Sequence, residues 1–208
     1  MPGNMELSDT AARLSRGDFS TLRRRLMKAM LGGVLLPGLP RQVLSHADFG
    51  PVAPVKSVPS LACVLSDGRT ATLVKLLTGK TTALQLMFTG CSAICPIQGA
   101  LFARLQGMLP NQLARNIQLL SLSIDPLSDD PKALSAWLKR FAARPGWIAA
   151  SPALAALGQV TALFRSGVNA ADNHSTQVYL INRGAQLVWR TSDLPTPREI
   201  ADLLLQLV

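Results

Sequence analysis

Residues 81–96 read TTALQLMFTGCSAICP, and this stretch decides the fold. Thr81 to Phe88 is β-capable and mostly apolar, which is typical of a strand in the centre of a sheet. After Cys91 the apolar residues instead recur three or four positions apart, which is the spacing of a helix face. These positions are Ile94, Ile97, Leu101, Leu105 and Met108. The sequence therefore predicts a buried strand that turns into a helix, with two cysteines at the junction.

The rest of the chain continues the alternation of strands and helices. Further strands are predicted at 61–65, 117–124, 147–150, 177–182 and 186–191, and further helices at 130–141, 152–164 and 197–207. The last two strands form a hairpin around Arg183-Gly184-Ala185. This order predicts an α/β sandwich with a mixed sheet, built from residues 61–208 as one domain.

The first 47 residues have the features of an export signal. Residues 22–28, LRRRLMK, precede an apolar stretch at 29–39. That stretch is far shorter than the roughly 20 residues that span a bilayer. Ser45-His46-Ala47 offers small residues for cleavage before Asp48. The order of residues 23–28 resembles a twin-arginine signal, and an ordinary export signal or an uncleaved membrane anchor are the alternatives.

Residues 48–60 follow this signal and contain Pro51, Pro54 and Pro59. We expect them to form an extended lead-in without regular structure. The formal net charge is +9, and residues 1–47 hold seven Lys and Arg against three acids. The remaining basic residues are spread along the chain without interleaved aromatic residues, so the sequence does not favour a nucleic-acid partner.

The cysteines at 91 and 95 are candidates for redox or metal chemistry. Residues four apart share a helix face, so the two sulfurs can meet or hold an ion together. A helix N-terminus also favours the thiolate, which is both the nucleophile and the metal ligand. A purely structural disulfide is the alternative, but it would close a very short loop and restrict the unfolded chain little. Cys63 falls within a predicted strand, where we expect a small buried hydrophobic residue.

His174 is the one histidine beyond the predicted cleavage site. It stands in the polar segment NAADNHS at 169–175, just before the predicted strand at 177–182. Taken alone it could be a solvent-exposed loop residue. In a thioredoxin-like sheet, however, this loop passes beside the helix that carries the cysteines. Two sulfurs and one nitrogen suit Cu(I), whereas Zn would normally take a fourth ligand.

Three motifs resemble those of one known family, in the same order. FTGCSAICP at 88–96 resembles its strand followed by Thr-x-Cys-x-x-x-Cys-Pro. SIDPLSDDP at 123–131 resembles its strand ending in Asp-Pro, followed by Asp-Thr-Pro at the next helix. His174-Ser175, with YLINRG at 179–184, resembles its histidine, strand and Asp-x-x-Gly turn. Residues 60–207 therefore resemble the Sco/SenC family of proteins that assemble cytochrome c oxidase.

The resemblance implies a thioredoxin-like three-layer sandwich in the periplasm. Cys91, Cys95 and His174 would bind copper, as Cu(I) or Cu(II), and the cysteine pair would also be redox-active. The partners implied are the CuA-bearing subunit of a terminal oxidase, or another periplasmic cuproprotein, and a thiol reductant. Contact with a membrane would come through an uncleaved N-terminus alone. A thiol–disulfide oxidoreductase acting on an exported protein is the alternative function. Asp125 ends a strand near the site, where it could support the metal ligands or cap the turn.

Overall fold

The computed structural model describes residues 49–110, 115–164 and 176–208 of the chain. All of them belong to one compact unit, His46–Val208. The expected export signal at 1–47 and the segment that carries His174 lie outside the described residues. No helix of the described segments combines the length and the apolar character needed to cross a membrane.

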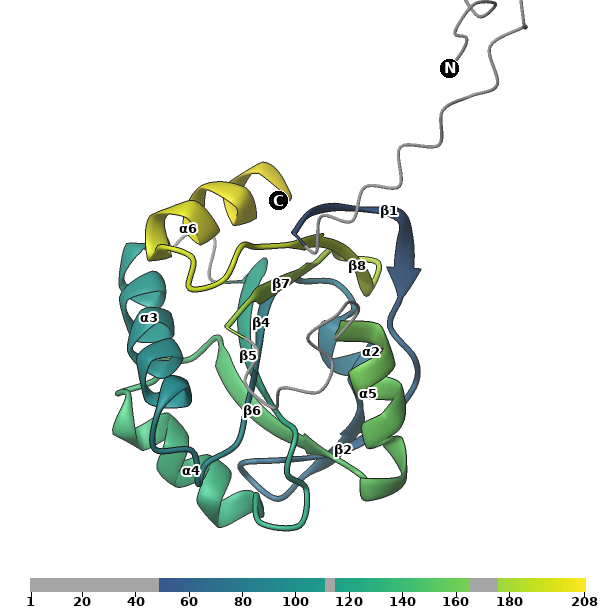
Figure 1. The fold of residues 1–208 in the computed structure, drawn as a ribbon, viewed down its shortest axis with the longest axis vertical. Coiled ribbons are helices and arrows are strands. Elements are labelled where there is room, and N and C mark those ends of the chain that lie inside the picture. The colour runs from purple at the N-terminus through teal and green to yellow at the C-terminus, as the bar shows by residue number, and fades with distance from the viewer. Residues whose placement is uncertain (1–48, 111–114, 165–175) are drawn as a thin grey trace, which may run out of the picture. The chain divides into compact units, whose positions relative to one another are not determined.

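The described strands form one mixed sheet in the order β1-β8-β7-β4-β5-β6-β2-β3 (Figure 1). The three central strands β4, β5 and β6 run parallel, and every other neighbouring pair is antiparallel. The strands are β1 (Gly50–Ser57), β2 (Ala62–Leu65), β3 (Thr70–Thr72), β4 (Thr81–Met87), β5 (Ile117–Ser123), β6 (Trp147–Pro152), β7 (Val178–Ile181) and β8 (Gln186–Arg190). The mixed sheet predicted from the sequence is confirmed.

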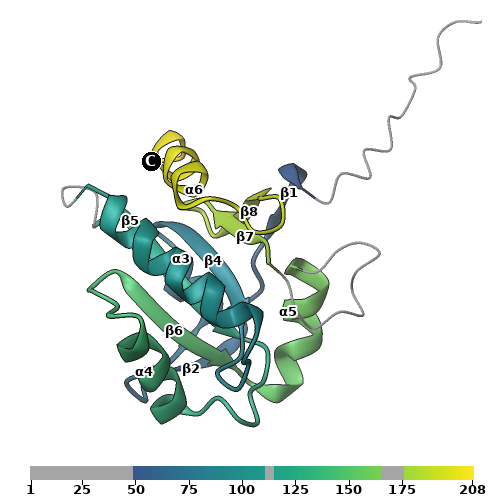
Figure 2. The ribbon, with the colours of Figure 1, turned by 60° about the vertical axis from the view of Figure 1, so that its left-hand side comes forward.

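Helices cover both faces of the sheet and make it the middle of three layers. They are α2 (Leu73–Leu77), α3 (Ile94–Met108), α4 (Pro131–Arg140), the short 3₁₀-helix η2 (Leu154–Ala156), α5 (Leu157–Phe164) and α6 (Pro197–Gln206). Figures 1 and 2 show α3, α4 and α6 on one face and α2 and α5 on the other. This arrangement confirms the predicted three-layer sandwich.

The side chains of β4 alternate between two cores because successive residues of a strand point to opposite faces. Leu84 and Leu86 pack in the core beneath α2 and α5. Ala83 packs against Phe102 of α3, and Met87 lies in a separate cluster with both site cysteines. All seven residues of β4 are buried, as are all seven of β5, which explains their largely continuous apolar sequence.

Several expected boundaries are wrong. Residues 50–57 are not an irregular lead-in, because they form β1 and pair with β8 at the edge of the sheet. Pro51 and Pro54 are tolerated there, since one side of an edge strand needs no ladder donor. Helix α3 begins at Ile94, so Cys91 lies in the preceding turn. Pro152 ends β6 instead of beginning a helix. The short elements β3 and α2 were not predicted, because a three-residue strand and a five-residue helix leave little periodicity.

Candidate metal centre

The two cysteines meet where β4 passes into α3. The Cys91 and Cys95 side chains are both buried, and both residues are thiols. The Cys95 N–H donates to Cys91 Sγ at 3.4 Å. Ala93 is the N-cap of α3 and makes no side-chain capping bond. The sulfur of Cys91 therefore takes the place of a capping oxygen. It accepts a hydrogen bond from an N–H group that has no intrahelical partner in the first turn.

The two thiols differ in acidity. Burial is the strongest single effect on Cys91 and opposes its ionisation. The pKa of Cys91 nevertheless lies below that of an ordinary thiol, because its sulfur accepts hydrogen bonds from the Cys95 N–H and thiol and from the N–H groups of Ala93 and Ile94. Cys91 is thus the sulfur prepared to act as a thiolate.

Cys95 behaves in the opposite way. Burial raises its pKa to about 12. The Phe88 N–H partly opposes this rise, whereas Cys91 and the negative charge of Asp129 add to it. A thiol in this environment keeps its proton at neutral pH unless a cation replaces it. Of the pair, Cys91 is therefore the residue that ionises more readily, and the Cys95 thiol donates a hydrogen bond to its sulfur.

A buried carboxylate that sequence reasoning missed lies beside this pair. Asp129 is 1% exposed and accepts hydrogen bonds from the Thr89 main chain and from the Thr89 and Ser123 hydroxyls. Apart from its place in the motif at 123–131, no local pattern marks Asp129. Its neighbour Asp125 closes the turn through its main chain, because its carbonyl accepts from the Ser128 and Asp129 N–H groups.

The described residues supply two of the three predicted metal ligands. Cys91 and Cys95 are brought together, and His174 lies outside the described part of the chain. Within that part, no group of three or more His, Cys, Asp or Glu residues is placed to hold a metal ion. Two adjacent soft sulfurs fit Cu(I), and a third ligand has to come from elsewhere. Cys63 is buried in β2 and its thiol donates to the Leu61 carbonyl, as expected of a structural cysteine.

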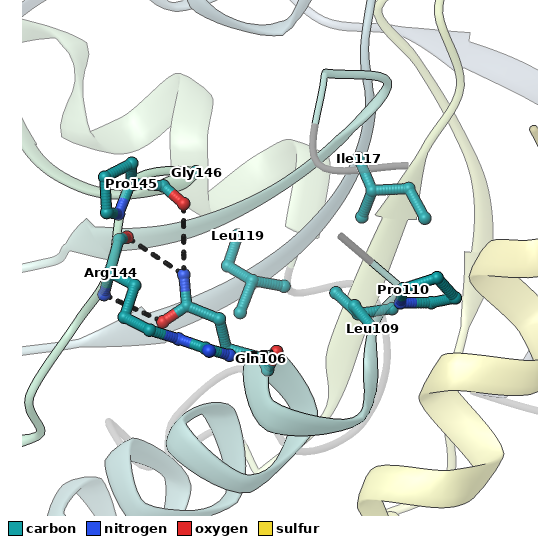
Figure 3. A pocket seen from close by; sticks show the side chains of 8 residues that line it. All are labelled: Gln106, Leu109, Pro110, Ile117, Leu119, Arg144, Pro145 and Gly146. Atoms are coloured by element: carbon teal, nitrogen blue, oxygen red, sulfur yellow. Dashed lines mark hydrogen bonds between the residues drawn. The ribbon is translucent and has the colours of Figure 1, made fainter. Parts of the chain in front are cut away.

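A cavity of about 220 Å³ lies at the opposite end of the sheet, where β5 and β6 begin. Figure 3 shows its lining residues, which contain no cysteine. Gln106 spans one wall, because its amide donates to the Arg144 carbonyl and accepts from the Arg144 N–H. These bonds fasten the end of α3 to the loop before β6. The cavity is therefore separate from the cysteine pair.

The fold is a three-layer sandwich, and two thiols lie at the start of the helix that follows a central parallel strand. These features define a thioredoxin-like dithiol protein. The family model described as SCO1/SenC matches residues 62–208. The chain belongs to the SCO1/SenC family.

Named relatives agree with this membership. A Stutzerimonas stutzeri protein, described as a candidate copper-binding protein, is 30% identical over 132 residues. The match covers 62% of this chain and 63% of that relative, so this chain spans less than two thirds of the relative's length. A SCO1/SenC family lipoprotein from Bacillus anthracis superposes with a TM-score of 0.62 at 25% identity, covering 76% of this chain and 96% of that one.

Two further structures share the fold. ScoI of Bradyrhizobium japonicum, solved with copper bound, has a TM-score of 0.59 at 23% identity, over 77% of this chain and 99% of that one. BsSco, described as a member of the Sco family of cytochrome c oxidase assembly proteins, has a TM-score of 0.59 at 20% identity. The superposition covers 73% of this chain and 92% of BsSco.

Proposed function

We propose that this protein is an exported copper-binding assembly factor. It holds one copper ion through Cys91, Cys95 and His174, and it delivers copper to, or redox-prepares, the CuA centre of a terminal cytochrome oxidase. The observation that carries the proposal is the contact of the two cysteine sulfurs at the N-terminus of α3. Membership of the SCO1/SenC family and the copper-bound relative support the choice of metal.

The cysteine pair suits a metal that is carried and then released. Soft thiolates select Cu(I), and a site of three ligands keeps an open side through which a partner can reach the ion. The N–H groups of the first turn stabilise the negative charge of Cys91. Oxidation of the pair to a disulfide removes both thiolates, so metal binding and redox state are linked through the same two atoms.

The proposed location is the periplasm. It is supported by the export pattern of residues 1–47 and by the lipoprotein among the relatives. The proposed partners are the CuA-bearing subunit of the oxidase, or another periplasmic cuproprotein, and a reductant that restores the thiols.

Cu(I) titration against a competing chelator tests this function. We expect one equivalent of Cu(I) to bind to the reduced protein and binding to collapse in the Cys91→Ala and Cys95→Ala variants. His174→Ala should weaken binding while leaving the dithiol able to oxidise. Cys63→Ala is the matched control, because it removes a buried thiol in β2, and it should bind as the wild type does. Full copper affinity in the His174 variant would contradict the proposal.

The unequal acidity of the thiols favours one alternative, a thiol–disulfide oxidoreductase. The Cys91 thiolate would attack a partner disulfide, and Cys95 would then displace the partner as a dithiol and leave a Cys91–Cys95 disulfide. An external dithiol would reduce that disulfide and be oxidised in turn. Rapid reduction of insulin by metal-free protein, unchanged by His174→Ala, would favour this alternative over copper transport.

A further inference from the structure

The turn that carries Cys91 is fastened to a neighbouring loop through one side chain. The turn spans residues 88–91 and is closed by the Cys91 N–H, which donates to the Phe88 carbonyl at 3.2 Å. Thr89 lies inside it, two residues before Cys91. The Thr89 N–H donates to Asp129 Oδ1 at 3.0 Å, and its hydroxyl donates to the same oxygen at 2.5 Å. The Thr89 N–H also reaches Asp129 Oδ2 at 3.2 Å, so Asp129 holds the corner of the turn through both donors of Thr89.

The other carboxylate oxygen is fixed from the sheet. Ser123, the last residue of β5, donates its hydroxyl to Asp129 Oδ2 at 2.6 Å and accepts from the Asp125 N–H at 3.0 Å. The Asp129 N–H donates to the Asp125 carbonyl at 3.0 Å. The side chain is thus held on one side by β5 and its following loop, and on the other side it holds the cysteine turn.

The burial of Asp129 shows that this arrangement is specific. Burying a carboxylate away from water costs free energy unless hydrogen bonds or a cation compensate its charge. In the described segments the ion pairs are Arg69–Asp67 and Arg198–Asp202, so hydrogen bonds are what compensate Asp129 there. The bonds to this carboxylate come from Thr89 and Ser123. A buried anion held in this way fixes its donors tightly, because releasing either one would leave a desolvated charge with fewer partners.

We propose that Asp129 is a positioning residue for the dithiol: by holding Thr89, it fixes the turn that sets Cys91 opposite Cys95. The consequence for copper rests on the proposed function, whereas the consequence for the disulfide does not. Two sulfurs held at a fixed separation bind an ion, or join to each other, more readily than sulfurs on a loose turn. Loss of the Asp129–Thr89 link should therefore weaken both events.

Two variants test the link, and each has a matched control. Asp129→Asn removes the charge and one acceptor at nearly constant volume. Thr89→Val removes only the hydroxyl donor and leaves Asp129 bonded to Ser123. Asp130→Asn is the control for charge, because Asp130 caps α4 through Ala133 and asparagine caps equally well. Thr81→Val is the control for loss of a buried hydroxyl bond, since Thr81 lies at the other end of β4 and its hydroxyl donates to the Leu207 carbonyl at 3.2 Å.

The first measurement is the metal-free dithiol–disulfide equilibrium in glutathione buffers. Two thiols give two protons and two electrons to glutathione disulfide, which yields the Cys91–Cys95 disulfide and two glutathione molecules. The second measurement is Cu(I) affinity, and thermal unfolding accompanies both. We expect Asp129→Asn to weaken Cu(I) binding by about 10- to 100-fold and Thr89→Val by a smaller factor. Both should shift the thiol equilibrium toward the dithiol, whereas both controls should stay near the wild type.

Each outcome separates this inference from the proposed function. A folded Asp129→Asn or Thr89→Val variant with the wild-type thiol equilibrium would overturn the positioning role. An equal shift in Thr81→Val would also overturn it, because the effect would then follow general stability. If the wild type binds no Cu(I) but Asp129→Asn and Thr89→Val still shift the thiol equilibrium, the proposed function fails and the positioning role stands.

Discussion

The packing of α3 against α4 predicts that two glycines in one helix respond oppositely to alanine. A Cβ added at Gly99 would lie 2.4 Å from two ring carbons of Phe141, whereas one added at Gly107 would meet nothing within 4 Å. Ordinary carbon contacts lie at about 3.5–4.0 Å. The Phe141 ring has little room to retreat, because its centroid lies 4.7 Å from that of Trp137 and 6.3 Å from that of Trp147.

The expected magnitude follows from two opposing terms. Replacing a helical glycine by alanine stabilises by up to about 1 kcal/mol. Overpacking a filled core costs about 1–3 kcal/mol. Gly107→Ala should therefore raise the free energy of unfolding slightly. Gly99→Ala carries the same gain and the steric cost, so it should be about 1–3 kcal/mol less stable than Gly107→Ala, because the propensity term largely cancels between the two variants.

Urea unfolding of the two variants, followed by tryptophan fluorescence, measures this difference. The double variant Gly99→Ala/Phe141→Leu supplies the check, because a smaller side chain at 141 should recover much of the loss. Equal stability of the two alanine variants would refute the reasoning, as would a Gly99→Ala loss that Phe141→Leu leaves unchanged. In either case the close approach of α3 to Phe141 would not govern stability.

Two further predictions concern the thiols and a buried amide. Iodoacetamide should modify Cys91 before Cys95, because the pKa of Cys91 is lowered and that of Cys95 is raised. The rate at Cys91 should increase with pH, with an inflection below the pKa of an ordinary thiol. Peptide mass spectrometry checks this, and earlier modification of Cys95 would contradict it. Gln98→Met should raise the free energy of unfolding by about 1–2 kcal/mol, because both amide atoms of buried Gln98 have no hydrogen-bond partner among the described residues. A stability loss in chemical denaturation would contradict this prediction.

Local patterns were sufficient for the central elements. The apolar run of β4 and the change to helical spacing after it predicted the strand-to-helix junction, since burial on both faces and a 3.6-residue period are properties of neighbouring residues. The same holds for β5, for the β7–β8 hairpin, and for α4, where Asp130 and Pro131 mark the start. Cys91 and Cys95 were expected to share a helix face, but Cys91 belongs to a turn closed by its own main chain, and α3 begins at Ile94.

The candidate site was predictable in part. The spacing of Cys91 and Cys95 was enough to expect two sulfurs in contact, because four residues make about one helical turn. Their unequal acidity could not be predicted from the spacing, since it depends on how deeply each sulfur is buried and on which N–H groups point at it. The third ligand, His174, stays a prediction.

By itself the sequence determined the buried strands, the junction that carries the thiol pair and the mixed α/β class, because each depends on residues close together in the chain. The tertiary structure alone decided that residues 50–57 pair with β8 as an edge strand of the sheet. It also decided that Asp129 bonds to Thr89, which lies 40 positions away in the sequence. Pairing and burial between distant segments leave no local period, since the partners meet only after the chain has folded around a common core.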